Sequence, residues 1–559
     1  MNSVKFFFLC FSVLILSSCT HKQQVDLIVH NAVIYTVDSS FSNAESFAVK
    51  DGKFIAVGTN DEILNKYEAK ETIDAQGKAV YPGLIDSHCH FYGYGKGLQE
   101  LDLVGTKSFD DVIQKVIAYS KTNKSSWIIG RGWDQNDWPV KEYPDKKVLD
   151  SLFPGTPVFL QRVDGHAALV NNAAFKLVQG FLDADKIKGG VIEMKNGQLT
   201  GILIDNAVDL VKDVIPKPSE EEIKNSLLAA QKNCFAVGLT TVDDAGLEKK
   251  IIENIDELQK SGELKMRIYA MLTDNQENAD HYLKSGPYKT DRLDVRSFKF
   301  YADGALGSRG ACLLKPYSDK PEQQGFLLSK PEHFDSAAVK LINSGFQMNT
   351  HCIGDSAVSL ICGIYQTEIN KRLTLESQIP SVINTRWRIE HFQVITPNDL
   401  LYLDAKNNYI IPSVQPTHAT SDMYWAKDRL GPERVKYAYA YNDLLKAAGM
   451  LALGTDFPVE DINPMYTFYA AVARKDLKGF PEGGFQPENA LSRENTLRGM
   501  TIWGAYANFE EKEKGSIEVG KFADFVILDT DIMKCAIDKV PETKVVSTYV
   551  NGEKVFEKK

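Results

Sequence analysis

A short pattern recurs eight times along this chain of 559 residues and limits the folds that are open to it. Each copy is a run rich in apolar and β-branched residues that ends abruptly in a polar or acidic group and precedes a helical stretch. The runs are Gly83 to His90, Val237 to Gly246, Leu264 to Leu272, Val295 to Gly304, Phe346 to Asp355, Thr385 to Val394, Tyr409 to His418 and Gly449 to Pro458. Eight strands that alternate with helices predict an α/β fold, a parallel (β/α)8 TIM-like barrel.

Other segments surround the predicted barrel, which occupies residues 83–504. Residues from about 92 to 215 separate the first two strands, far more than an ordinary connection needs, so we expect an inserted subdomain on the loop face. Residues 19–82 and 505–559 instead contain short alternating strands with turn signals such as Asn551-Gly552-Glu553. Neither end makes a stable sheet alone, so we expect them to pack together as a small β-sandwich.

The first residues are typical of a targeting segment rather than of a folded element. Lys5 precedes an apolar run over residues 6–16 that is too short to span a bilayer but suits a signal peptide, which we place at residues 1–18. Ser17-Ser18-Cys19 resembles a bacterial lipobox, which predicts a lipid anchor on Cys19 and a position at the membrane surface of the bacterial cell envelope, facing the periplasm or the outer membrane. An ordinary secretory signal with a chance cysteine is the alternative.

Composition excludes two classes of protein. The 74 Asp and Glu residues outnumber the 64 Lys and Arg residues, and no basic stripe is present, so no nucleic acid partner is expected. The only long apolar run lies at the N-terminus, which excludes a polytopic membrane protein. With 43% hydrophobic residues the body has material for a large core. The sequence leaves the oligomeric state open, a homo-oligomer included.

Histidines and one aspartate gather at the ends of the predicted strands. Four of the ten histidines, His88, His90, His351 and His391, fall at or near the carboxyl ends of strands, and Asp456 ends the eighth strand. His88 and His90 are two residues apart and therefore face the same way. Imidazoles and a carboxylate at this end of a barrel match the ligands of zinc or a similar divalent ion. A single strand-end histidine more often satisfies a local hydrogen bond, but five such residues on four strands favour a metal site.

Lys299 on the fourth strand allows two interpretations. Beside divalent ions its amine would favour the neutral form and could take up carbon dioxide, which gives a carbamate able to bridge two metals. Alternatively, Lys299 pairs with a carboxylate, and spacing does not decide between these roles. Trp127, Trp133 and Trp138, with Arg131, suggest an aromatic and cationic lid, although such clustering also arises from packing.

Together these motifs resemble the amidohydrolase superfamily, and more narrowly its branch related to N-substituted formamide deformylases (amidohydrolase family 3). The resemblance rests on the segments 82–90, 350–355, 388–391 and 454–458 and on the lysine before Asp303-Gly304, and it covers nearly all of the mature chain. It implies one metal held by His88, His90 and Asp456, a second held by His351 and His391, and a carbamylated Lys299 between them. Some branches keep only one metal.

The resemblance implies a metal-dependent hydrolase that acts on a small-molecule substrate and cleaves a C–N bond of an amide, formamide or cyclic amide with metal-activated water. Asp456 would act as general base, and His391 or a second metal would stabilise the oxyanion. His166 resembles part of a family insert that overhangs the substrate pocket, although a structural turn is an alternative; His418, at the end of the seventh strand, has the same two alternatives, and Asp303 is grouped with these substrate-binding candidates.

Two other functions use the same residues. The site could hydrolyse a lactone or another ester, because oxygen leaving groups depart more easily. Alternatively, the chain is a surface lipoprotein that binds a metal or a ligand without turnover. The substrate itself is not readable, because specificity lies in the insert and in loops whose side chains follow no code.

Overall fold

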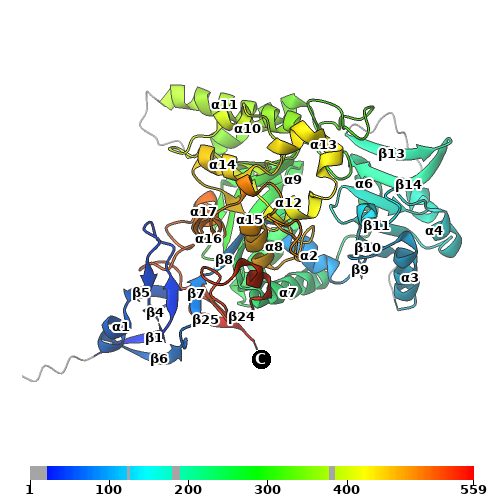
Figure 1. Ribbon diagram of the computed structural model, residues 1–559. Helices are drawn as coiled ribbons and strands as arrows, with labels where there is room; N and C mark the ends of the chain where they lie inside the picture. Colours follow the sequence, from blue (N-terminus) through cyan, green and yellow to red (C-terminus); the bar gives the residue numbers. More distant parts are fainter. Residues whose placement is uncertain (1–21, 123–125, 179–188, 377–383, 559) are drawn as a thin grey trace, which may run out of the picture.

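A parallel barrel forms the centre of the protein in this computed structural model, which describes residues 22–122, 126–178, 189–376 and 384–558 (Figure 1). Its eight strands follow one another around the sheet in chain order, and each predicted run overlaps one of them, which extends beyond the run by at most two residues. They are β8 (Leu84–Cys89), β15 (Leu239–Leu247), β16 (Arg267–Thr273), β18 (Leu293–Tyr301), β19 (Gln347–Cys352), β20 (Trp387–His391), β21 (Ile410–Val414) and β22 (Ala452–Leu453). The predicted barrel is therefore confirmed. A short strand, β17 (Tyr288–Lys289), pairs with β18 in the antiparallel sense.

The barrel nearly closes between its last and first strands. The amide of Asp456 donates to the carbonyl of His88 at 2.8 Å, and the amide of His90 donates to the carbonyl of Phe457 at the same distance. These two bonds bring the segment after β22 against the end of β8. As a consequence, residues more than 360 positions apart in sequence meet at the carboxyl end of the barrel.

Helices surround these strands, and the largest hydrophobic core lies between the two layers (Figure 1). The capping box expected at Ser219 and Glu222 is present and starts α7 (Glu220–Ala236). The others are α2 (Phe91–Gly97), α8 (Lys249–Lys260), α9 (Gln276–Ser285), α10 (Pro331–Ser344), α11 (Asp355–Glu376), α12 (Pro416–Asp422), α13 (Ala426–Arg434), α14 (Tyr441–Ala448), α15 (Pro464–Ala473), α16 (Arg493–Gly499) and α17 (Ile502–Ala507). None of the helices in the described ranges is long and apolar enough to cross a membrane.

A separate mixed sheet lies between β8 and β15 in the sequence and to one side of the barrel (Figure 1, cyan). Its strands, in spatial order, are β13 (Gly190–Lys195), β14 (Gln198–Asp205), β12 (Ala167–Val170), β11 (Val158–Arg162), β10 (Ile128–Trp133) and β9 (Leu101–Asp102). Its helices are α3 (Phe109–Ser120), α4 (Lys147–Leu152), α5 (Asn172–Leu177) and α6 (Asn206–Lys212). Two hydrophobic clusters of its own stabilise it. This subdomain is the predicted insert, and below we call it the insert.

The two chain ends form two further sheets on the side of the barrel away from the insert (Figure 1). One contains β5 (Lys53–Gly58), β4 (Ser46–Lys50), β1 (Gln23–His30) and β6 (Tyr67–Asp74), with α1 (Asn60–Lys66) beside it. The other contains β25 (Glu553–Glu557), β24 (Val545–Val550), β23 (Phe525–Leu528), β7 (Ala79–Pro82), β2 (Val33–Tyr35) and β3 (Asn43–Ala44). Phe47, Phe54 and Phe525 pack edge-on between the sheets. The predicted signal peptide and Cys19 lie outside the described residues.

Candidate metal centre

The carboxyl end of the barrel gathers the five residues that the sequence singled out. His88, His351 and His391 lie in β8, β19 and β20 at or next to their last residues. His90 directly follows β8, and Asp456 lies three residues after the end of β22. The ring centroids of His88 and His391 are 4.9 Å apart, and those of His351 and His391 are 4.5 Å apart. The parallel strands thus bring these side chains to one end of the barrel, as catalytic residues are placed in this fold.

Three of the five are close enough to hold one ion. His88, His391 and Asp456 each offer a ligand atom, and these atoms lie within 4.8 Å of one another; all three residues are buried. The resemblance instead grouped His90 with His88 and Asp456. In the structure His90 Nε2 lies 3.3 Å from Asp456 Oδ1, so His90 stands next to this group at its more exposed side.

Each of three imidazoles is held by its Nδ1 atom. His88 Nδ1 lies 2.5 Å from Glu390 Oε2, His90 Nδ1 lies 3.0 Å from the carbonyl of Ala245, and His391 Nδ1 lies 2.8 Å from Gln415 Oε1. An oxygen acceptor at Nδ1 assigns the proton to that nitrogen and leaves Nε2 as the free ligand atom. The three rings are therefore held in the tautomer that binds a metal.

The backbone at this site is strained where two of the ligand candidates stand. His391 has a φ of 73° and Asp456 a φ of 62°, in the left-handed region that side chains other than glycine rarely adopt. Such conformations cost about 1–3 kcal/mol each and persist only where surrounding contacts impose them. His391 is the last residue of β20, and Asp456 lies three residues after the end of β22, so both strained residues stand where the chain leaves a barrel strand.

Electrostatics keep three of the imidazoles, those of His88, His351 and His391, neutral and the carboxylate of Asp456 charged. Burial lowers the pKa of His88 to about 4, with a further decrease from the charge of Lys299, and burial holds the pKa values of His351 and His391 well below the usual value. Burial would raise the pKa of Asp456, but contacts with His418 and His90 keep it well below its usual range. Neutral imidazole and ionised carboxylate are the protonation states in which these groups bind metals.

The donor set fits a divalent cation. Asp456 Oδ1 is buried without a hydrogen-bond partner among the described residues, and it lies 3.7 Å from His88 Nε2 and 3.3 Å from His90 Nε2. His418 instead approaches the other oxygen, Oδ2, so Oδ1 is the buried acceptor that a cation would satisfy. Two imidazole nitrogens and a carboxylate are a ligand set that zinc and similar ions use in catalytic sites.

Lys299 is almost fully buried and points into the same space. Its Nζ lies 3.3 Å from His88 Nε2 and 4.8 Å from the centroid of the Tyr301 ring. Burial lowers the pKa of Lys299 to about 8. In the described part of the chain no carboxylate lies within 4.0 Å of this amine, so the structure does not support the alternative in which Lys299 pairs with a carboxylate.

Asp303 lies under His351 and away from the mouth of the barrel. Its side chain is fully buried, and its two oxygens accept hydrogen bonds from the amides of Cys312, Ile353 and Gly354 at 2.7–3.0 Å. One oxygen is also 3.7 Å from His351 Nε2. These contacts occupy both oxygens of Asp303 with backbone amides, and its predicted contact with the substrate stays a prediction.

The other two substrate candidates lie beside the centre. His418 belongs to α12, stacks on His391 with 5.7 Å between ring centroids, and lies 3.4 Å from Asp456 Oδ2. Burial would lower the pKa of His418, but Asp456 raises it to about 9. His166 comes from the insert; its Nδ1 is 2.7 Å from Asp205 Oδ1 and its ring centroid is 5.2 Å from that of His351.

The tryptophans do not form a lid. Trp127, Trp133 and Trp138 are all buried in the two cores of the insert. The indole nitrogens of Trp133 and Trp138 donate to the carbonyls of Leu160 and Thr106. The three rings therefore cluster because they pack in these cores, which is the second of the two interpretations.

Sequence reasoning missed a buried layer of charge beneath the histidines. Arg388 is fully buried and forms ion pairs of 2.7 Å with both Asp243 and Glu390, and Glu390 in turn holds His88. Burial would raise the pKa of Glu390, but Arg388 and His88 keep it well below the usual value. A signal was present: Arg388 and Glu390 are two residues apart on β20 and so share a face.

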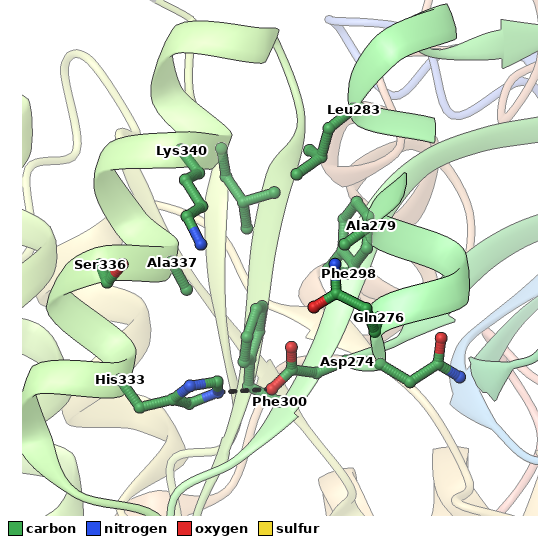
Figure 2. A pocket seen from close by; sticks show the side chains of 12 residues that line it. Asp274, Gln276, Ala279, Leu283, Phe298, Phe300, His333, Ser336, Ala337 and Lys340 are labelled. Carbon is green, nitrogen blue, oxygen red and sulfur yellow. Dashed lines mark hydrogen bonds and ion pairs between the residues drawn. The ribbon is translucent and has the colours of Figure 1, made fainter. Parts of the chain in front are cut away.

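A cavity lies on the outer side of the barrel, and none of the residues that line it belongs to the metal centre. It has a volume of about 360 Å³ and lies between α9 and α10 against β18 (Figure 2). Figure 2 shows the ion pair of His333 with Asp274, 2.5 Å long, at one end and Lys340 above Phe300. Phe298 and Phe300 form its floor, on either side of Lys299 in the sequence.

Comparisons with known proteins identify the family of the chain. The sequence model described as "Amidohydrolase family" matches residues 71–556. The chain is 32% identical to the protein LONG AFTER FAR-RED 3 of Arabidopsis thaliana, over 95% of this chain and 91% of that protein. It is 25% identical to an N-substituted formamide deformylase of Arthrobacter pascens, over 96% and 99%. A metal-dependent hydrolase of Pyrococcus horikoshii OT3 shares 28% identity and superposes with a TM-score of 0.73, over 91% of this chain and 99% of that one.

Proposed function

Because the chain belongs to the amidohydrolase family, as its motifs predict, we propose that this metal-dependent hydrolase cleaves a C–N bond of an amide, a formamide or a cyclic amide. The observation that carries the proposal is the buried group of His88, His391 and Asp456, whose ligand atoms lie within 4.8 Å of one another. The similarity to an N-substituted formamide deformylase supports the choice of a C–N bond.

His88, His391 and Asp456 would hold one divalent ion, which we propose to be zinc, with His90 beside them. A bound divalent ion lowers the pKa of water to about 7 and polarises a carbonyl oxygen. We propose a second ion only if His351 and a carbamylated Lys299 take part. Metal analysis of the intact chain and ¹³C NMR after incubation with ¹³CO2 test this: two ions per chain without a carbamate signal would contradict it, and one ion without that signal would indicate the single-metal site.

Within the chain, Asp456 is the proton carrier. It accepts a proton from the attacking water and delivers it to the leaving nitrogen, which is otherwise a poor leaving group. His418, 3.4 Å away and protonated at neutral pH because Asp456 raises its pKa to about 9, keeps Asp456 ionised and able to accept that proton. The role of His391 in stabilising the oxyanion stays a prediction.

The test replaces Asp456 by Asn in the full chain. At saturating Zn²⁺ we expect the variant to retain much of the bound metal and to lose amide turnover by about 10²- to 10⁴-fold, because the proton carrier is absent. Asp110→Asn, at an exposed position of the insert, is the control for the change in charge. Near-normal turnover of the Asp456 variant would refute the assignment.

The same assay decides which bond is cleaved. Matched amides, formamides and esters are compared with the metal-loaded wild-type chain. Hydrolysis of esters and lactones without amides would replace the proposed reaction by the ester alternative. Full metal occupancy without hydrolysis of any compound would indicate a binding protein instead.

We also propose that the mature chain is attached to the membrane through a lipid on Cys19, as the lipobox predicts. In a bacterial host, the wild-type chain should sediment with the membrane fraction and Cys19→Ser should not. Equal distribution of both chains between the fractions would rule out the anchor.

A further inference from the structure

Arg131 of the insert is a cation that lacks an ionic partner. It lies on β10, and in the described part of the chain no carboxylate oxygen lies within 4.0 Å of its guanidinium. Its Nη2 donates to the carbonyl of Val163 at 2.6 Å, while its Nε is buried without a hydrogen-bond partner. A half-buried guanidinium with open donors is costly, so its environment is incomplete without a further acceptor.

A second arginine of the insert, Arg162, differs from Arg131 because carboxylates of the insert pair with it. Arg162, on the adjacent strand β11, forms ion pairs with both Asp134 and Asp164. Gln135 Oε1 accepts a further hydrogen bond from Arg162 Nε at 2.9 Å. Within the insert, Arg162 is therefore neutralised by two carboxylates, whereas Arg131 keeps an N–H group without an acceptor in the described part of the chain.

Arg131 is connected to the candidate metal centre through residues 163–166 of the insert. The Val163 carbonyl that it contacts lies three positions before His166, whose ring is 5.2 Å from that of His351. Gly165 leaves room there, since a Cβ atom on it would lie 3.9 Å from Arg131 Nη2. Burial lowers the pKa of Arg131, and the strongest opposing attraction comes from Asp456, so the guanidinium is within electrostatic reach of the centre.

We propose that Arg131 binds a carboxylate of the substrate and thereby makes carboxylate-bearing amides the preferred substrate class. A guanidinium fork matches a carboxylate with two parallel hydrogen bonds. Once a cation shares Asp456, the attraction of that carboxylate for Arg131 is reduced, and an anion on the substrate replaces it. The inference deepens the proposed function and rests on it: Arg131 orients the amide while Asp456 and the histidines act on its carbonyl.

The test compares acids with their neutral isosteres. N-formyl and N-acetyl derivatives of glycine, leucine and phenylalanine, in both enantiomers where these exist, are paired with the corresponding primary amides. Binding is measured by calorimetry on the full chain, with and without Zn²⁺, and kcat/KM is measured where turnover occurs. We expect the acids to be preferred about 10- to 100-fold and Arg131→Gln to abolish that preference with little effect on the neutral amides.

Two further variants control for charge and fold. Lys107→Gln removes one positive charge from an exposed position of the insert and should leave the preference unchanged. Arg131→Lys retains the charge without the fork and should restore part of the preference. Equal thermal midpoints would show that the insert remains folded in all variants.

The outcomes separate this inference from the proposed function. Amide hydrolysis with no preference for acids, or an equal loss for acids and neutral amides in Arg131→Gln, overturns the role of Arg131 and leaves the proposed function intact. Arg131-dependent binding of the acids without hydrolysis of any amide supports the role of Arg131 and rejects the proposed reaction.

Discussion

Glu390 shows how a side chain that binds no metal can control the residues that do. It is fully buried, it lies 2.5 Å from His88 Nδ1, and it pairs with Arg388, which also pairs with Asp243. The chain from Asp243 to His88 is therefore alternately negative and positive and ends on a ring whose proton it fixes. A carboxylate behind a ligand histidine also raises the basicity of its free nitrogen.

Replacing Glu390 by Gln should weaken metal binding without unfolding the barrel. Gln keeps an acceptor for His88 but loses the charge, so we expect a 10- to 100-fold higher Kd for Zn²⁺, measured by calorimetry against a competing chelator. Glu433→Gln, at an exposed position of α13, is the control. An unchanged Kd would mean that Glu390 serves folding only.

At the level of elements, α2 ties the metal centre to the helical layer. It begins at Phe91, directly after His90, and it packs on α7. Gly95 makes this close approach possible, because a Cβ atom on it would lie 2.0 Å from the carbonyl oxygen of Ser226. Movement of α2 away from α7 would therefore move the backbone of His90.

The pair of glycines in α2 allows a matched comparison. Gly95→Ala should destabilise the protein by about 1–3 kcal/mol, because backbone atoms of α7 cannot yield as a side chain would. Gly97→Ala, for which no atom lies within 4 Å of the added Cβ, should be neutral or slightly stabilising. Urea unfolding of both variants measures the difference, and equal stabilities would contradict the packing explanation.

At the level of the whole molecule, one buried ion pair joins the barrel to the sheets formed by the chain ends. Arg267 at the start of β16 contacts both oxygens of Asp524 at 2.5 and 3.1 Å, and its guanidinium lies 4.0 Å from the centroid of Phe522. Asp524 also accepts the amide of Asn551 at 2.9 Å. The contacts lie at the amino end of a barrel strand, opposite the metal centre, where stability rather than catalysis is expected.

Arg267→Met should therefore lower the stability of the folded chain, because it removes the ion pair between the barrel and the terminal sheets, and should leave metal affinity unchanged. It leaves Asp524 buried and unpaired, which costs about 3–5 kcal/mol, and the second change Asp524→Asn should recover much of that loss. Lys265→Met, which breaks the more exposed pair with Glu553, should cost at most about 1 kcal/mol. Thermal unfolding and metal affinity are compared; a larger effect on metal affinity than on stability would reject this division.

Much of the fold and part of the site followed from the sequence alone. The eight runs each overlap a barrel strand. His88, His351, His391 and Asp456 gather at one end, because parallel strands of a barrel all end on the same face. The capping box at Ser219 was equally readable, because it depends on residues three positions apart. Such features are local, or repeat with the period of a strand or helix.

The sequence determined the order of strands and the residue types at their ends. The tertiary structure alone decided which of those residues lie close enough to hold one ion and which have other contacts. That His391 rather than His90 completes the tight group, that Asp303 lies under His351, and that Arg131 lacks a carboxylate partner all depend on side-chain directions between segments tens to hundreds of residues apart. The physical reason is that spacing along a strand fixes a face, whereas distances between strands depend on register, backbone strain and the packing of the whole barrel.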